Sequence, residues 1–234
     1  KDVRIVECVP NFSEGRNMDV INQITREVES VKGVKLLDVD PGEATNRTVV
    51  TFVGSPEDVC EAAFRAVKKA GQLIDMRQHH GAHPRFGATD VCPLVPVAGI
   101  TLEECAELAR KLGERFANEL EIPCYLYEAA AQTEERKNLA VCRRGEYEKL
   151  AERLGTELAD VENTAVAAIS SKQAKEFIFF ISSFFTFLPF YLLKPFYLLK
   201  FESYSQKEGS AILISSHDGL IALLAQTERS EERF

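Results

Sequence analysis

Apolar and polar positions alternate along the first 130 residues in two distinct rhythms. Short runs rich in β-branched residues predict strands, and longer stretches with an apolar residue every three or four positions predict helices. The predicted strands are residues 3–9, 34–39, 47–53, 90–97 and 123–127. The predicted helices are residues 18–31, 56–74 and 102–120.

Turn and cap residues mark where these elements begin and end. Asp40-Pro41-Gly42 is a strong turn signal, and it leaves too short a link for a crossover helix, so the second and third strands are expected to be antiparallel neighbours. Ser55 before a proline and Thr101 in a capping box are typical helix starts. Pro93 and Pro96 predict that the fourth strand is an edge strand or is kinked.

The order β-α-β-β-α-β up to residue 97 predicts the fold class. It is typical of an α+β, ferredoxin-like fold, in which helices cover one face of an antiparallel sheet. A further helix and strand follow, which extend the sheet and can make it mixed. Residues 133–154 are polar and are expected to be helical, with a break at Gly145.

Composition narrows the function classes. The chain has 234 residues and a net charge of −8, and this acidic balance argues against nucleic acid as the main partner. Six cysteines are scattered without a C-x-x-C pair. They are expected to be reduced, mostly buried thiols of a cytoplasmic protein, not a disulfide framework or a zinc site.

The last third of the chain differs from the rest. Residues 171–234 hold seven acidic and seven basic residues, residues 177–193 carry no charge, and PFYLLK occurs twice. Seventeen uncharged residues are at the lower limit for spanning a bilayer. A membrane-inserted segment, a buried hairpin and a non-native or disordered C-terminus all remain open. We therefore expect a folded domain over residues 1–160 and an unrelated hydrophobic tail over residues 161–234.

Three of the four histidines lie in one loop, residues 79–87. Gly81 and Pro84 disfavour the regular helix that would align these histidines, and no Glu or Cys follows at ligand spacing, so we expect no metal. A loop with two glycines and a proline can hold an imidazole in one pose, and His is suited to proton transfer near pH 7. An ordinary surface loop remains the alternative.

A second polar loop, residues 38–48, joins two predicted strands. Asp40 could orient or stabilise an imidazolium, and Asn46 or Arg47 could bind an anionic group of a substrate. A hairpin turn with solvated charges is the alternative.

A third polar loop, residues 9–16, precedes the first helix. Gly15 and the start of that helix can bind a carboxylate or phosphate. The alternative is a simple helix cap provided by Ser13 or Asn17.

Five segments carry a resemblance to a known family. They are VECVPNFSEGRN at 6–17, LLDVDPGEATNRTVVTFVG at 36–54, LIDMRQHHGAHPRFGATDVCPLVPV at 73–97, PCYLYEAA at 123–130 and RRGEYEKL at 143–150. In this order and spacing they resemble the N-terminal subdomain of glutamate formimidoyltransferases, the formiminotransferase half of formimidoyltransferase-cyclodeaminases. The resemblance runs from about residue 3 to about residue 154.

The resemblance implies a reaction and a set of site residues. The formimino group of N-formimino-L-glutamate passes to N5 of tetrahydrofolate, a co-substrate, in histidine degradation, with no covalently bound cofactor. The H-P-R motif makes His83 the implied general base. Asp40 matches a family aspartate that could hold this imidazole. Arg85, Arg47 and Asn46 are candidates for binding carboxylates of the substrate or of folate.

The resemblance also implies partners and a location. Members of this family are expected to be cytoplasmic homodimers, with a Golgi or centrosome association in some. The family pattern ends near residue 154, where a second subdomain that completes the folate cleft is expected. The alternative function is therefore a truncated, non-catalytic protein that binds folate or pairs with a full-length partner. Membrane contact is expected only through the tail.

Overall fold

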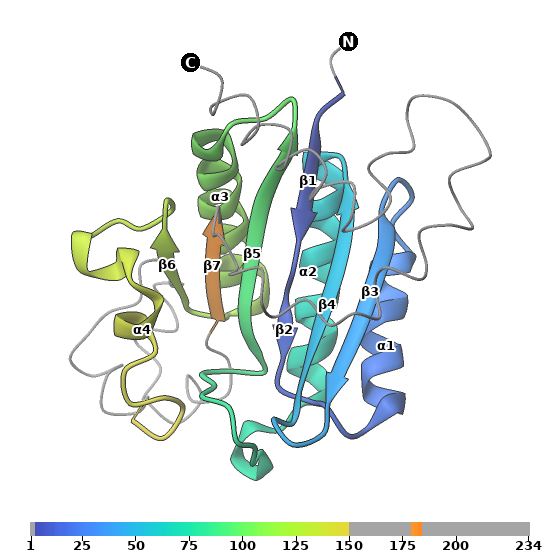
Figure 1. Ribbon diagram of the computed structural model, residues 1–234, viewed down its shortest axis with the longest axis vertical. Helices are drawn as coiled ribbons and strands as arrows, with labels where there is room; N and C mark the ends of the chain where they lie inside the picture. The colour runs from blue at the N-terminus through green and yellow to red at the C-terminus, as the bar shows by residue number, and fades with distance from the viewer. Residues whose placement is uncertain (1–2, 150–178, 184–234) are drawn as a thin grey trace, which may run out of the picture. The chain divides into compact units, whose positions relative to one another are not determined.

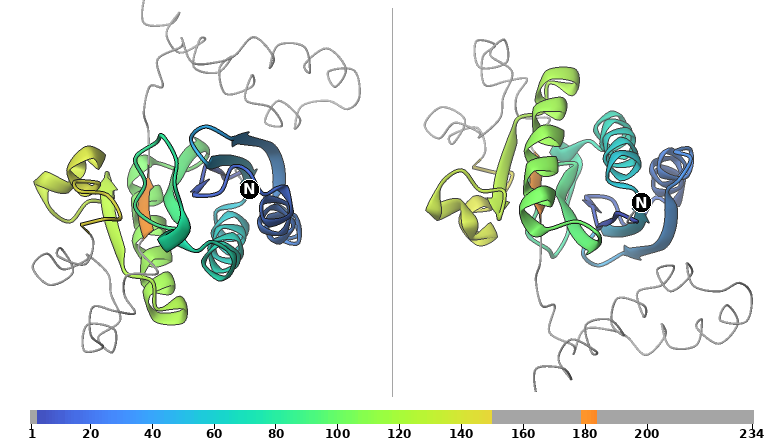
Figure 2. Two further views of the ribbon diagram at one scale, coloured as in Figure 1. Left: turned by 90° about the horizontal axis from the view of Figure 1, so that it is seen from below. Right: turned by 90° about the horizontal axis from the view of Figure 1, so that it is seen from above.

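The computed structural model describes residues 3–149 and 179–183. These residues form an α+β fold in which three long helices lie on one face of a single sheet (Figure 1, Figure 2). The helices are α1 (Met18–Glu29), α2 (Pro56–Leu73) and α3 (Leu102–Leu120). All three lie where the apolar periodicity predicted them.

The sheet contains seven strands among the described residues. They are β1 (Ile5–Cys8), β2 (Asn11–Phe12), β3 (Lys35–Gly42), β4 (Arg47–Gly54), β5 (Thr89–Ala98), β6 (Cys124–Glu128) and β7 (Phe179–Ser183). Their spatial order is β3, β4, then β1 and β2 in one row, then β5, β7 and β6. The strands from β3 to β5 pair antiparallel, whereas β7 runs parallel to both β5 and β6.

The predicted pairing of the second and third strands is confirmed. β3 and β4 form an antiparallel hairpin in which Asp40 faces Val49 and Gly42 faces Arg47. The predicted edge position of the fourth strand is wrong, because β5 pairs with β1 and β2 on one side and with β7 on the other. An irregularity in register does occur opposite Pro96, where Val6 pairs with Pro96 and Ile5 with Ala98.

The cap residues act as the sequence predicts. The side chain of Ser55 accepts a hydrogen bond from the Asp58 amide at the start of α2. Thr101 and Glu104 form a reciprocal capping box at the start of α3. These bonds satisfy amides that lack a partner within the helix.

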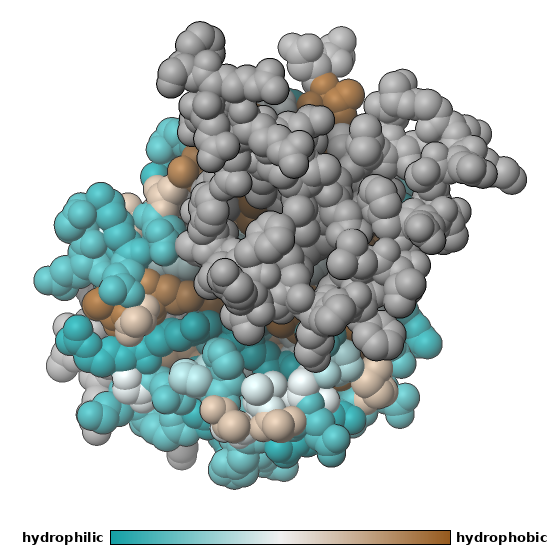
Figure 3. Space-filling model, in the orientation of Figure 1, coloured by the Kyte–Doolittle hydropathy of each residue, from teal (hydrophilic) through white to brown (hydrophobic). Residues whose placement is uncertain are grey.

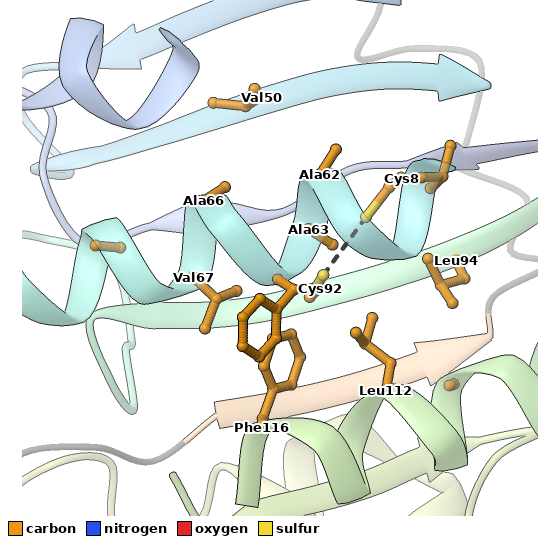
Figure 4. Close-up of a cluster of buried hydrophobic side chains, with 14 of the residues drawn as sticks. Cys8, Val50, Ala62, Ala63, Ala66, Val67, Cys92, Leu94, Leu112 and Phe116 are labelled. Carbon is orange, nitrogen blue, oxygen red and sulfur yellow. Dashed lines mark hydrogen bonds between the residues drawn. The ribbon is translucent and has the colours of Figure 1, made fainter. Parts of the chain in front are cut away.

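The core lies between the sheet and the three helices. Figure 4 shows side chains from β1, β4, α2, β5 and α3 meeting there, including Val50, Val67 and Phe116. The Sγ atoms of Cys8 and Cys92 lie 3.4 Å apart in this core. All six cysteines are free thiols, and five are buried. The sixth, Cys60, is partly buried, and this desolvation raises its pKa to about 12, so the thiol stays protonated.

The predicted helix over residues 133–154 is wrong for most of its length. The described part contains a 3-10 turn, η2 (Glu134–Lys137), and one helical turn, α4 (Leu139–Cys142). Gly145 and Glu146 then adopt positive φ angles of 83° and 52°, which an α-helix does not accommodate. Residues 150–154 lie outside the described residues.

The predicted tail contributes one described strand. β7 falls within residues 161–234, and it lies between β5 and β6 (Figure 1). The rest of the 177–193 segment lies outside the described residues. No helix in the described part of the chain is both long enough and apolar enough to cross a membrane. The domain boundary at residue 160 stays a prediction.

Candidate functional site

The three polar loops singled out in the sequence meet at one end of the sheet. The loop after β2, the β3–β4 turn and the loop after α2 lie together at the lower end of Figure 1. Asn46, in the turn, links the other two loops. Its Oδ1 accepts a hydrogen bond from the Gly15 amide at 2.9 Å, and its Nδ2 donates to the His80 carbonyl at 3.1 Å.

Two glycines allow these loops to approach so closely. A Cβ on Gly81 would lie 2.1 Å from the Thr45 carbonyl oxygen, and one on Gly15 would lie 2.4 Å from that of Gly42. Both distances are far below van der Waals contact, so each position excludes any side chain. The loops are thus held as one unit by backbone packing and by Asn46.

His83 lies against the guanidinium of Arg47. Nη1 of Arg47 is 2.6 Å from Nδ1 and 3.2 Å from Nε2 of the imidazole, and Nδ1 lies 2.5 Å from the Pro84 carbonyl oxygen. Burial and the Arg47 charge lower the pKa of His83 below its usual value. The ring is therefore neutral near pH 7 and can accept a proton.

Asp90 is the carboxylate that the structure brings to this cluster, and the sequence analysis did not single it out. It is fully buried, and its Oδ2 lies 3.0 Å from Nη1 of Arg47. The same oxygen pairs with Nη2 of Arg143, whose Nε is buried and has no hydrogen-bond partner among the described residues. The sequence signal that could have revealed Asp90 is an acidic residue in an otherwise apolar strand, because a buried carboxylate requires a charged partner.

Arg85 is already engaged by carboxylates of its own chain. Its Nη1 and Nη2 lie 2.9 Å and 2.6 Å from the two carboxylate oxygens of Glu148, and Nη1 lies 3.2 Å from Glu146. These contacts raise the pKa of Arg85. The guanidinium thereby fastens residues 146–148 to the histidine loop.

His79 is buried and held in one tautomer. Nε2 donates to the Asn46 carbonyl at 2.8 Å, and Nδ1 accepts from Nε of Arg85 at 3.2 Å. Burial, and secondly the charge of Arg85 that a proton on Nδ1 would face, lower the pKa of His79. His79 therefore braces the loop as a neutral ring.

Asp40 lies apart from this cluster. It is exposed on β3, the outermost strand next to β4, whereas Asp90 is the carboxylate in contact with Arg47. Its role in holding the imidazole stays a prediction.

The start of α1 is capped by Asn17, which is the alternative to anion binding that the sequence left open. Oε1 of Glu14 accepts from the Arg16 and Asn17 amides, and Oδ1 of Asn17 accepts from the Asp19 and Val20 amides.

A pocket of about 340 Å³ opens beside the histidine loop. It is lined by Met76, Arg77, His79, His80, Arg85, Tyr147 and Glu148. Side chains at this end of the visible face are mostly hydrophilic (Figure 3). Within the described ranges, no three His, Cys, Asp or Glu side chains gather so that they could hold a metal ion. The available chemistry is proton transfer at His83 and binding of anionic groups by arginines.

Comparison with known proteins gives the chain relatives of known family. Residues 5–172 match the model of the formiminotransferase domain, N-terminal subdomain. Over 151 residues the chain is 57% identical to the formimidoyltransferase-cyclodeaminase of Sus scrofa and 50% identical to the glutamate formimidoyltransferase of Streptococcus pyogenes serotype M1. A glutamate formimidoyltransferase of Thermoplasma acidophilum is 48% identical over 155 residues.

These alignments cover different shares of the proteins. They include 64% of this chain with the first two relatives and 65% with the third. They span 28% of the length of the Sus scrofa protein, 50% of the Streptococcus protein and 51% of the Thermoplasma protein. The family model extends beyond residue 154, where the resemblance was expected to end. The chain belongs to the formiminotransferase family, of which it carries the N-terminal subdomain.

Proposed function

We propose that this chain provides the catalytic half of a glutamate formimidoyltransferase site. The reaction moves the formimino group of N-formimino-L-glutamate to N5 of tetrahydrofolate, which acts as co-substrate, and the chain needs no covalently bound cofactor. The observation that carries the proposal is a neutral His83 held against Arg47 at the end of the sheet. Family membership and relatives named as glutamate formimidoyltransferases support it.

His83 has two roles in the proposed reaction. As N5 of tetrahydrofolate adds to the formimino carbon, the imidazole takes the proton from that nitrogen. The C–N bond to glutamate then breaks, and the imidazolium returns the proton to the departing glutamate nitrogen. Arg47 disfavours the charged ring, so the proton is returned readily. No net proton or electron is consumed.

Arginines are proposed to bind the carboxylates of the two substrates. Arg47 lies beside His83, and Arg85 lines the adjacent pocket. A ligand carboxylate at Arg85 would compete with Glu148, whose side chain is 61% exposed. Both polar groups of the Asn46 amide already bond to neighbouring loops, so Asn46 is proposed to contribute by holding the loops in place.

Further features of the family extend the proposal. We propose that β1 to β5 with α1 and α2 form a ferredoxin-like unit, because the order β3, β4, β1, β5 with antiparallel neighbours matches that pattern. We also propose a cytoplasmic homodimer. The location and the dimer follow from the family and not from a particular contact.

Turnover by the full 234-residue chain tests the proposal. His83→Gln should lower kcat by about 100-fold or more, the usual contribution of general acid–base catalysis. Gln78→Ala changes an exposed residue beside the same loop and should leave kcat unchanged. Equal activity of the two variants would refute the role of His83.

The second candidate is a truncated protein that binds folate without turnover. The observation that favours it is that the chain spans about half the length of its single-function relatives. Calorimetry with tetrahydrofolate separates the two candidates. Binding without turnover supports the second candidate, and turnover that depends on His83 supports the first.

A further inference from the structure

Asp90 owes its position to an irregularity in β5. Asn11 pairs with Val91 and Phe12 pairs with Thr89, so Asp90 lies between the two and has no partner in this register. A bulge of this kind turns a side chain away from the regular alternation of a strand. The carboxylate is fully buried, and burying a charge is costly unless it is paired.

Both oxygens of this carboxylate are used. Oδ1 accepts a hydrogen bond from the Phe86 amide at 2.9 Å, within the loop that carries His83. Oδ2 pairs with Nη1 of Arg47 at 3.0 Å and with Arg143. One carboxylate thus touches the histidine loop, strand β4 and the segment after α4.

The next link runs from Arg47 to the imidazole. Nε of Arg47 donates to Oδ1 of Asn11 at 2.8 Å, and Nη1 is shared between Asp90 and His83. The guanidinium is therefore held by Asn11 through Nε and by Asp90 through Nη1, and the same Nη1 contacts the ring of His83.

We propose that Asp90 is the positioning residue of this site: it holds the Arg47 guanidinium on the His83 ring and fixes the loop of His83 through the Phe86 amide. The importance of this arrangement for catalysis rests on the proposed function. The positioning itself does not rest on the proposed function, because it can be measured without substrate. The charged groups that act on His83 are Arg47 from β4, Arg143 after α4 and Asp90 from β5, with the Pro84 carbonyl beside the ring.

A double-mutant cycle on the His83 titration tests this link. The chain has four histidines, so the His83 resonance can be followed by NMR and assigned as the signal missing in His83→Gln. In the wild-type chain, Arg47→Gln removes a cation from the ring and should raise the pKa of His83. In the Asp90→Asn background Arg47 is no longer held, so the same replacement should produce a smaller rise.

A matched background separates positioning from a general loss of charge. Arg143→Gln removes the other guanidinium but leaves the Asp90–Arg47 pair, so Arg47→Gln should retain its full effect there. Asp90→Glu keeps the charge but moves it by one methylene, and it should also weaken the Arg47 effect. This variant decides the question if Asp90→Asn does not fold.

Two results would overturn the proposal. The first is that Arg47→Gln raises the pKa of His83 by the same amount in the wild-type chain and in the Asp90 variants. The second is that the Arg143→Gln background weakens this rise as much as the Asp90 variants do. With substrates, Asp90→Asn should lower kcat by about 100-fold, the cost of a misplaced catalytic group, with a smaller change in KM. If His83→Gln retains turnover, the proposed function fails while the titration cycle still decides the positioning role.

Discussion

The side chain of Asn46 joins two loops to the β3–β4 turn. Asn46 is buried, its φ angle of 49° lies in the left-handed region, and its side chain bonds to two other loops. Asn tolerates this backbone conformation better than most residues. The histidine loop and the loop before α1 thus depend on one residue of the β3–β4 turn.

Replacing Asn46 should separate backbone strain from lost hydrogen bonds. Asn46→Gly keeps the left-handed backbone but leaves the Gly15 amide and the His80 carbonyl unpaired, at a cost of about 2–3 kcal/mol in the free energy of unfolding. Asn46→Ala should cost about 1 kcal/mol more, because its Cβ disfavours this conformation. Urea unfolding measures both, and equal losses would contradict the assigned role of the backbone.

Two histidines should make stability depend on pH. Burial lowers the folded-state pKa of His79 and His83 below the unfolded value of about 6.5, so the unfolded chain binds more protons. Their contribution to the free energy of unfolding is complete above about pH 6.5. It falls as the pH drops from that value towards the folded-state pKa values.

Urea unfolding between pH 7.5 and 5.5 should therefore show decreasing stability. His79→Gln should reduce the slope of the free energy of unfolding against pH over this window. An unchanged slope would show that the buried ring is protonated as readily in the folded chain as in the unfolded one.

Among single residues, the sequence identifies the proposed base, His83, but not the residues that hold it. His83 is recognisable because its loop combines histidines with Gly81 and Pro84, and because it matches the H-P-R motif. Asp90 is not recognisable as its partner, since their link runs through Arg47, distant in sequence, and depends on the bulge in β5. The ion pair between Glu148 and Arg85 is equally hard to predict, because no local sequence pattern connects the two residues.

The helices of this fold are specified largely by local signals. Apolar periodicity predicts α1, α2 and α3, and the capping residues predict where two of them begin. By contrast, the polar composition of residues 133–149 favours a helix that long-range contacts replace with turns. The amide of Tyr147 donates to the Arg85 carbonyl, and Arg85 binds Glu148. Such contacts cannot be derived from the segment alone.

Capping gives a prediction with a matched control. Thr101→Ala removes the hydroxyl that accepts a hydrogen bond from the Glu104 amide, which is one half of the capping box on α3. This change should lower the free energy of unfolding by about 1 kcal/mol. Thr133 also precedes a helical turn, η2, but its side chain makes no capping bond. Thr133→Ala should therefore have little effect. Thermal unfolding compares the variants, and similar losses would mean that the capping bonds are not the cause.

The whole sheet joins segments that lie far apart in the sequence. β7 pairs with β5 at residues 92–94 and with β6 at residues 124–128. Element order predicts the antiparallel half, where neighbours are joined by short turns. It does not predict β7, because strand pairing over such separations depends on the assembled core rather than on local pattern.

Truncation should reveal whether β7 stabilises the sheet. A chain ending at residue 172 keeps the whole family match but lacks β7, and it leaves backbone groups of β5 and β6 without their strand partner. A chain ending at Phe185 retains the strand. The shorter chain should unfold at lower urea and aggregate more readily. Equal midpoints would show that β7 contributes little.

The place of β7 has a consequence for how the chain matures during synthesis. β7 is the last described strand to leave the ribosome, yet it fills a position inside the sheet. Until residue 183 has emerged, two strand edges stay open, and the pairings that close them span much of the chain. Long-range pairing of this kind is slow, and open edges attract other chains. Completion of the sheet is thus expected to be a late event, and until then the open edges of β5 and β6 can pair with other chains.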